Sequence, residues 1–226
     1  MQRSVIIVAG GKGKRMNASI PKQFVELNGK PILMHTIECF ARFDEHILIV
    51  VALPIEHISF WEKLCQTHHF LIPHTIVAGG NTRFQSVKNG LAAIQKSELI
   101  AVHDGVRPLT SDYLVRHCFE EAYYHETAVP MCRVTESVRM ITSHGSQYVD
   151  RDSLRLIQTP QVFQSFILRA AYGQMYEHSF TDDASVVERM GIQLNLIDGE
   201  QTNIKITTPF DLKMAEMILN SGQDVK

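Results

Sequence analysis

A short apolar segment near the amino terminus leads directly into a glycine-rich, basic stretch. Residues 4–9 read S-V-I-I-V-A, and residues 10–15 read G-G-K-G-K-R. The first segment predicts a buried β-strand, because β-branched residues favour strands. Glycines allow a backbone to approach a ligand closely and to turn its N–H groups inward. Together the two segments predict a strand followed by a loop that binds phosphate groups.

Four cationic residues lie in or near this loop. Lys12, Lys14 and Arg15 are within it, and Lys22 follows a few residues later. Two unit charges ~4 Å apart repel by about 4 kcal/mol at an effective dielectric constant of ~20, so such a cluster favours a bound anion. Lys12 and Lys14 can instead point to solvent. We expect Arg15 and Lys22 to contact phosphate, because arginine offers two N–H groups at once and lysine a point charge.

The common phosphate-binding motifs fit this loop poorly. A P-loop requires Ser or Thr after Gly-Lys, and none stands there. A dinucleotide fingerprint requires a third glycine where this chain has Met16. An NAD-linked dehydrogenase is therefore not indicated. A plain glycine turn between strand and helix remains an alternative for the loop taken alone.

Composition is that of an ordinary soluble globular protein. The 226 residues carry a net charge of −2, so generic binding to nucleic acid is not indicated. The four cysteines are widely spaced, which argues against zinc and disulfides and favours reduced thiols. No apolar run approaches the ~20 residues of a membrane span, and we expect no signal peptide at the amino terminus. We expect a single cytoplasmic domain, residues 1–226, without a membrane partner.

Strand-like and helix-like segments alternate along the chain. Apolar β-branched runs at 5–9, 47–52, 75–77 and 100–103 are separated by amphipathic segments that begin after Pro31, Gly80 and Ser111. This order predicts a Rossmann-like α/β fold with a mainly parallel mixed sheet flanked by helices. Ligands of such sheets lie beyond the carboxyl ends of the strands. Towards the end of the chain we expect helices at 166–177, at 184–189 and from Pro209, and extended segments at 193–197 and 203–206.

One segment departs from this alternation. Residues 133–141 and 147–150 read as two strands around a turn at 143–146, which predicts a protruding β-arm over residues 133–155. An isolated hairpin with few large apolar groups is marginal in water. We therefore expect it to pack on a second subunit, as a homodimer. A hairpin folded back on its own chain remains the alternative.

Several blocks resemble one enzyme family over nearly the whole length. The loop A-G-G-x-G-x-R and the block P-K-Q-F resemble nucleotidyltransferases that activate sugar and polyol phosphates. Six further blocks resemble the 2-C-methyl-D-erythritol 4-phosphate cytidylyltransferases: G-G-N-T-R-F-Q-S-V (79–87), H-D-G-V-R-P (103–108), V-D-R (149–151), T-P-Q-V-F (159–163), T-D-D-A-S (181–185) and N-I-K-I-T-T-P-x-D-L (203–212).

The resemblance implies a reaction and the residues that serve it. CTP and a methylerythritol phosphate would give a CDP-alcohol and pyrophosphate, with Mg²⁺ as cofactor. Arg15 and Lys22 would stabilise the transition state, and Arg151 and Lys205 would act with them. Asp104, at a strand end, would hold the metal; its simpler interpretation is a turn or cap residue. The residues implied to bind CTP are Ala9, Gly10, Gly11, Gly13, Gly80, Asn81 and Ser86.

The polyol phosphate would lie on a further set of residues, namely Arg107, Thr135, Arg151, Thr159, Thr181 and Lys205. Arg107 reads equally well as a structural salt bridge, and Ser86 as a helix-surface serine. Thr181 and the two acids after it can also be cap and first-turn residues. The resemblance further implies a swapped arm, so that Arg151 serves the neighbouring subunit. Asn81 stands where relatives often carry an acid, and its carbonyl can still accept a hydrogen bond.

Two other functions remain open at this point. A cytidylyltransferase for ribitol or ribulose 5-phosphate shares the loop, P-K-Q-F and N-I-K-x-T-T-P, while Val149-Asp150-Arg151 and T-D-D-A-S favour the methylerythritol substrate. A non-catalytic nucleotide-binding paralogue is expected to lack one of Arg15, Lys22, Asp104 or Lys205. All four are present.

Overall fold

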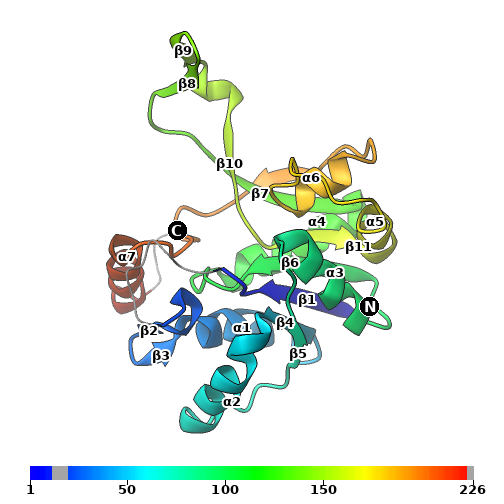
Figure 1. Cartoon of the computed structure of the whole chain (residues 1–226), viewed down its shortest axis with the longest axis vertical. Helices are drawn as coiled ribbons and strands as arrows, with labels where there is room; N and C mark the ends of the chain where they lie inside the picture. The colour runs from blue at the N-terminus through cyan, green and yellow to red at the C-terminus, as the bar shows by residue number, and fades with distance from the viewer. Residues whose placement is uncertain (12–19, 223–226) are drawn as a thin grey trace.

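The computed structural model describes residues 1–11 and 20–222 of the chain. A central sheet is covered by helices on both faces, and a β-arm projects from one side (Figure 1). The strands are β1 (Arg3–Val8), β2 (Glu26–Leu27), β3 (Lys30–Pro31), β4 (Leu48–Leu53), β5 (Thr75–Ala78), β6 (Leu99–Asp104), β7 (Thr127–Arg133), β8 (Val138–Thr142), β9 (Gly145–Val149), β10 (Arg155–Ile157), β11 (Gln161–Gln164) and β12 (Leu196–Asp198). The α-helices are α1 (Ile32–Phe43), α2 (Ile58–Thr67), α3 (Arg83–Ala93), α4 (Asp112–His125), α5 (Ser165–Ala171), α6 (Asp183–Glu188) and α7 (Pro209–Asn220).

The main sheet is mixed and mainly parallel. Its strand order is β10-β7-β11-β6-β1-β4-β5, with β12 pairing beside β7. β1 runs parallel to β4 and β6, and β5 runs parallel to β4. β11 is antiparallel to both β6 and β7, and β10 is antiparallel to β7. The Rossmann-like fold and the four strands predicted before residue 105 are confirmed.

Strand β1 shows why the apolar run becomes a central strand. Val5 and Ile7 face one core, which is built with α1 and α4, while Ile6 faces a second core built with α3 and α5. All three side chains are fully buried. Burying each of them contributes about 1.5–3 kcal/mol, so the strand is stable only with helices on both faces.

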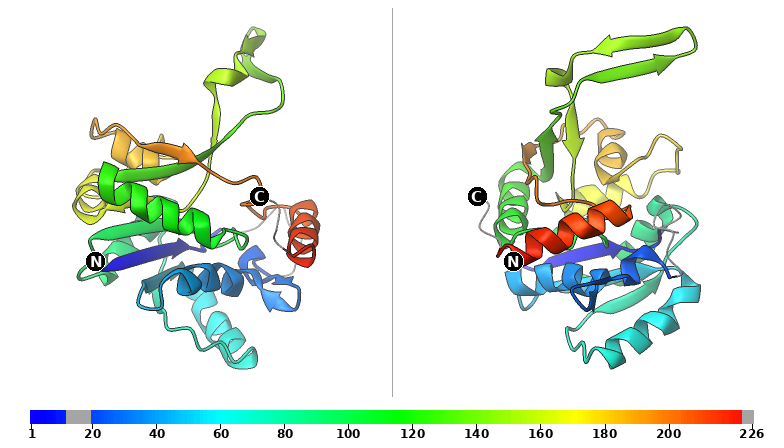
Figure 2. Two further views of the ribbon diagram at one scale, coloured as in Figure 1. Left: turned by 180° about the vertical axis from the view of Figure 1, so that it is seen from behind. Right: turned by 90° about the vertical axis from the view of Figure 1, so that its left-hand side faces the viewer.

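The strand register brings distant segments to one edge of the sheet. Val8 at the end of β1 pairs with Asp104 at the end of β6, and Leu53 of β4 pairs with Ala78 of β5. The loops that follow these strands therefore open at the same edge, as the parallel topology predicts. Helix α7 approaches this side of the molecule as well (Figure 2). Its first residue, Pro209, and its capping box between Thr208 and Asp211 fit the predicted helix start.

The arm lies where the sequence predicts it, with different strand limits. β8 and β9 form their own two-stranded sheet, and β9 begins at Gly145, inside the predicted turn. Arg133 belongs to β7, where it pairs with Arg155 of β10. The predicted first strand at 133–141 is therefore wrong in its first half, because Arg133 continues the main sheet.

Two further predictions differ from the structure. The helix predicted at 166–177 ends at Ala171. Beyond it the turn tightens, with Gly173 N donating to Ala170 O at 3.0 Å, and the hydroxyl of Tyr172 donates to the buried carboxylate of Asp183 at 2.6 Å. Residues 203–206 form no strand, although Ile206 N donates to Val106 O at 2.9 Å. Side-chain hydrogen bonds of Asn203 to Thr159 and Thr110 hold that segment instead. In the described residues, none of the helices has the length and apolar character that spanning a membrane requires.

Candidate active site

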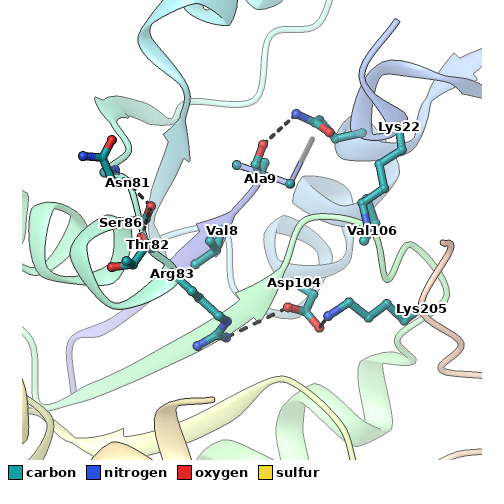
Figure 3. Close-up of a pocket in the computed structure, with 14 residues that line it drawn as sticks. Val8, Ala9, Lys22, Asn81, Thr82, Arg83, Ser86, Asp104, Val106 and Lys205 are labelled. Carbon is teal, nitrogen blue, oxygen red and sulfur yellow. Dashed lines mark hydrogen bonds and ion pairs between the residues drawn. The ribbon is translucent and has the colours of Figure 1, made fainter. Parts of the chain in front are cut away.

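A cavity of about 240 Å³ lies at the carboxyl edge of the sheet (Figure 3). Four separate segments and one distant lysine form its walls. The lining residues are Val8, Ala9, Gly10, Gly11, Lys22, Gln23, Gly80, Asn81, Thr82, Arg83, Ser86, Asp104, Val106 and Lys205. Nine of these are site residues expected from the sequence, so the strand ends do bring the predicted groups together.

The amino-terminal wall consists of residues 9–11 and the short turn that carries Lys22. Gln23 is 1% exposed, and its Nε2 donates to Ala9 O at 2.7 Å, which fixes the end of β1 against this turn. A Cβ atom on Gly11 would lie 3.3 Å from Cε of Lys22, so glycine leaves room for that side chain. Gly13 and Arg15, with Lys12 and Lys14, lie outside the described residues.

The opposite wall is the loop between β5 and α3. Ser86 Oγ accepts from Gly80 N at 3.1 Å and donates to Thr82 O at 2.9 Å, and Ser86 is only 3% exposed. The helix-surface interpretation of Ser86 is therefore wrong, because its hydroxyl braces the loop from inside. A Cβ atom on Gly80 would lie 2.4 Å from Cβ of Gln85, so only glycine fits there. Asn81, by contrast, is exposed at the cavity rim.

Asp104 lies at the centre of the floor among three cations. Its Oδ2 is 3.0 Å from Nζ of Lys205 and 3.2 Å from Nε of Arg107. Its Oδ1 is 4.0 Å from Nη2 of Arg83 (Figure 3). Burial raises the pKa of Asp104, but the charges of Arg83, Lys205 and Arg107 outweigh burial and hold that pKa well below its usual range. The carboxylate is thus ionised, and Lys205 reaches the site from a segment without regular secondary structure.

Thr159 and His103 support Asp104 from below. The backbone N–H of Asp104 donates to Thr159 Oγ1 at 3.1 Å, which leaves the hydroxyl hydrogen for Nδ1 of His103, also at 3.1 Å. Nε2 of His103 then carries a proton and faces Arg107 O at 3.3 Å. Burial lowers the pKa of His103 to about 3, so the ring is neutral at pH 7. Both side chains therefore act within the fold.

Arg107 has a structural environment. It is 8% exposed, and besides Asp104 it donates through Nη1 to Asn203 O at 2.7 Å. This contact ties the strand end of β6 to the segment that carries Lys205. The sequence left open two interpretations of Arg107, a substrate contact and a structural salt bridge. The structure shows the salt bridge.

Three expected substrate residues lie away from the cavity walls. Thr135 and Arg151 are both exposed at the base of the arm, where Nη1 of Arg151 donates to Thr135 O at 2.6 Å. Thr181 is exposed beside α6, and its backbone N–H donates to Ser185 Oγ at 3.1 Å. Asp182 caps α6 in a capping box with Ser185. The cap interpretation therefore holds for Asp182, while Thr181 keeps an exposed hydroxyl.

Arg83 is the most consequential residue that sequence reasoning missed. Its guanidinium lines the cavity and lies 2.7 Å from Oδ2 of the fully buried Asp183. Burial lowers the pKa of Arg83, but the charge of Asp183 outweighs burial and raises that pKa above its ordinary value. Val8, Gln23, Thr82 and Val106 were also missed as lining residues. All of them except Val8 stand inside the blocks that carried the resemblance, so the signal was present.

Comparison with known proteins agrees with this geometry. The family model described as 2-C-methyl-D-erythritol 4-phosphate cytidylyltransferase matches residues 4–221. A protein of that name from Bacteroides thetaiotaomicron is 51% identical over 219 residues, which cover 97% of this chain and all of that protein.

Solved structures show the same likeness. The 4-diphosphocytidyl-2C-methyl-D-erythritol synthase of Anaerococcus prevotii superposes with a TM-score of 0.81 at 27% identity, covering 97% of this chain and 96% of that one. The 2-C-methyl-D-erythritol 4-phosphate cytidylyltransferase of Thermus thermophilus gives 0.76 at 30% identity, covering 97% of this chain and all of that one.

Proposed function

The chain belongs to the 2-C-methyl-D-erythritol 4-phosphate cytidylyltransferase family, and from this membership we propose how its cavity performs the reaction. The enzyme transfers CMP from CTP to 2-C-methyl-D-erythritol 4-phosphate in isoprenoid biosynthesis, giving 4-diphosphocytidyl-2-C-methyl-D-erythritol and pyrophosphate. The observation that carries the assignment of roles is the convergence of Lys22, Asp104 and Lys205 on one glycine-lined cavity.

The reaction sets an electrostatic problem. A phosphate oxygen of the acceptor attacks the α-phosphorus of CTP, a P–O bond forms, and the bond to pyrophosphate breaks with its electron pair on the leaving group. Both reactants are anions. Positioning and charge neutralisation therefore supply most of the catalysis.

Lys22 and Lys205 flank the part of the cavity where phosphates would lie. Lys22 extends over Gly11, and Lys205 points towards Asp104 (Figure 3). We assign Lys22, with Arg15, to the charge that develops on the α-phosphate, and Lys205 to the phosphate of the acceptor. In this assignment Lys205 exchanges its ion pair with Asp104 for one with substrate.

Asp104 is the residue that would hold Mg²⁺. Among the described residues there is no group of three or more His, Cys, Asp or Glu that could hold a metal alone. This fits Mg²⁺, which commonly takes one or two carboxylates and completes its shell with phosphates and water. Held by Asp104, such an ion would supply positive charge that offsets the negative charge of the phosphates. Arg107 and Thr159 act through Asp104, by holding its carboxylate and its backbone.

The loop between β5 and α3 is assigned to the cytosine base. The exocyclic amine of cytosine needs an acceptor, and backbone carbonyls near Gly80 and the side-chain carbonyl of Asn81 can provide one. Ser86 shapes this loop from inside, as its two hydrogen bonds with Gly80 and Thr82 indicate.

The arm is assigned to a homodimer in which it serves the partner's cavity. Thr135 and Arg151 are exposed and lie away from the cavity of their own chain, and the arm exposes Met140 at 51%, Ile141 at 78% and Tyr148 at 75%. Apolar side chains so exposed on a two-stranded sheet favour burial against another surface. Thr135 and Arg151 would then contact the polyol phosphate bound to the partner, and Thr181 stays a predicted contact within the chain.

We also propose a cytoplasmic location. Cys39, Cys65, Cys118 and Cys132 all lie in the described part of the chain, and none forms a disulfide. Unpaired thiols fit a reducing compartment.

The test is a pyrophosphate-release assay with CTP, UTP or ATP and a panel of acceptors, at saturating Mg²⁺. We expect turnover with CTP and 2-C-methyl-D-erythritol 4-phosphate, and roughly 5- to 150-fold less with UTP, because an unpaired polar group in the base site costs about 1–3 kcal/mol. Turnover with ribitol or ribulose 5-phosphate and none with the methylerythritol substrate would contradict the assignment.

A further inference from the structure

Arg83 lies between two carboxylates at unequal distances. Its Nη2 is 2.7 Å from Oδ2 of Asp183 and 4.0 Å from Oδ1 of Asp104. The first distance is that of a direct ion pair, while the second is longer than a hydrogen bond. The guanidinium therefore leans towards Asp183 and away from the centre of the cavity.

Asp183 is built into the fold as an anchor. It is fully buried, and its Oδ1 accepts from the hydroxyl of Tyr172 at 2.6 Å. Among the described residues its Oδ2 accepts no hydrogen bond of good geometry, so Arg83 is what balances its charge. Tyr172 in turn stacks on Phe84, the neighbour of Arg83, with ring centroids 4.7 Å apart. Arg83, Asp183, Tyr172 and Phe84 thus form a closed ring of contacts.

The two oxygens of Asp104 are used differently as a result. Oδ2 is held by Lys205 at 3.0 Å and by Arg107 at 3.2 Å, whereas Oδ1 faces Arg83 at 4.0 Å without a direct bond to it. If Arg83 were released from Asp183, the nearest full negative charge would be Oδ1. The guanidinium would then occupy the oxygen that a divalent cation needs.

We propose that Asp183 is a positioning residue, which holds Arg83 away from Asp104 so that Oδ1 stays available to the divalent cation that accompanies CTP. The inference rests on the proposed role of Asp104 as the metal ligand. It predicts that Asp183 affects metal affinity although it touches neither metal nor substrate, and that its effect depends on Arg83.

The experiment measures Mn²⁺ binding by electron paramagnetic resonance, with CTP present and no acceptor. We expect D183N to weaken Mn²⁺ binding about tenfold or more, the usual effect of changing a group behind a metal ligand. In the double variant R83Q/D183N no guanidinium remains to compete, and Mn²⁺ affinity returns to within about threefold of wild type. In turnover assays D183N raises the Mg²⁺ concentration for half-maximal rate, while kcat at saturating Mg²⁺ changes little.

A matched control separates this effect from general destabilisation. Asp211, like Asp183, is an acid in the first turn of a helix; it belongs to the capping box of α7 and lies outside the residues that line the cavity. D211N lowers the melting temperature and leaves Mn²⁺ affinity unchanged. Unaltered affinity in D183N, or a double variant as weak as D183N, overturns the proposal. If D183N does not fold, the double variant decides alone, because weak Mn²⁺ binding in it contradicts competition by Arg83.

A failure of the underlying function is visible separately. D104N abolishes Mn²⁺ binding if Asp104 is the ligand. If D104N binds Mn²⁺ as wild type does, the metal role of Asp104 is wrong. If D104N loses the metal and D183N does not, only the role of Asp183 is wrong.

Discussion

Lys22 shows how much of this site depends on single charges. It begins the short turn Lys22–Phe24, and the buried Gln23 and Phe24 anchor that turn while Lys22 itself lines the cavity. Gln23 and Phe24 therefore fix the turn, and their neighbour Lys22 is left to face the cavity.

We expect Lys22→Ala to fold normally and to lose about 10²–10³-fold in turnover, the usual cost of removing one group that stabilises transition-state charge. Pyrophosphate release and thermal melting measure the two effects. Lys63→Ala, on an exposed position of α2, is the matched control and keeps the wild-type rate. A wild-type rate in Lys22→Ala would show that the assigned role is wrong.

At the residue scale, the sequence predicts the charges whose place in a family motif assigns them a role better than the charges that only the tertiary fold pairs. Asp104 and Lys205 are found because they stand inside blocks with a known pattern, and they lie 3.0 Å apart. Arg83 is missed because an arginine at the start of a helix normally points to solvent. Its partner Asp183 reads as a first-turn acid of a different helix, and only the tertiary fold brings the two together.

At the scale of one element, helix α3 and the loop before it form a unit. Thr82 Oγ1 accepts from Gln85 N at 3.1 Å to cap the helix, and Asn89 Nδ2 donates to Ala78 O at 2.8 Å. Together with the hydrogen bonds of Ser86, these contacts connect the loop before α3 to the first two turns of the helix. The shape of the loop between β5 and α3 is thus set by side chains behind it.

Removing the hydroxyl of Ser86 leaves Gly80 N without its partner, while Thr82 O keeps its bond from Ser86 N at 3.1 Å. An unmet hydrogen bond of this kind costs about 1–3 kcal/mol, so we expect Ser86→Ala to raise KM for CTP about tenfold while kcat changes much less. Steady-state kinetics and calorimetric titration with CTP measure this. Ser179→Ala, at an exposed loop position, provides the comparison. An equal fall of kcat and kcat/KM in Ser86→Ala argues instead for a role in the chemical step.

Element limits were least predictable where side chains override periodicity. The pattern of residues 166–177 continues as a helix in the sequence, yet α5 ends at Ala171, and the side chain of Tyr172 just beyond it bonds to Asp183. Residues 203–206 have the apolar alternation of a strand, but Asn203 is held by side-chain hydrogen bonds instead of a sheet. Neither partner can be identified from local sequence.

At the scale of the whole molecule, the arm and the cavity of one chain lie apart. Figure 1 shows β8 and β9 projecting from the body, while the cavity lies at the carboxyl edge of β1 and β6. A complete site that uses Arg151 therefore needs a second copy of the chain, as proposed above.

Mixing two inactive variants tests this arrangement. In a swapped dimer, Arg151→Ala and Lys205→Ala complement each other, because a mixed dimer contains one intact site and one site with both defects. Random exchange of equal amounts should restore about a quarter of wild-type turnover. Each variant alone, taken through the same exchange, is the control. No recovery after verified exchange indicates that Arg151 acts within its own chain.

The order of strands in the sheet could be predicted only in part. The first four parallel strands follow from alternation of β and α segments. The place of β11 does not, because Gln161–Gln164 inserts between β6 and β7 and runs antiparallel to both. Both of its partner strands lie earlier in the sequence. The sequence of a short strand does not show whether that strand pairs in a parallel or an antiparallel direction.

The pairing of Arg133 with Arg155 places the two ends of the arm beside each other on the main sheet. The intervening segment is a hairpin that adds no strand to the main sheet between these two ends. Its length and tip can drift over evolutionary time, or be exchanged by an engineer, while the main sheet keeps its own register. If the arm recognises a second copy as proposed, that task and the construction of the main sheet are encoded in separate segments of the chain.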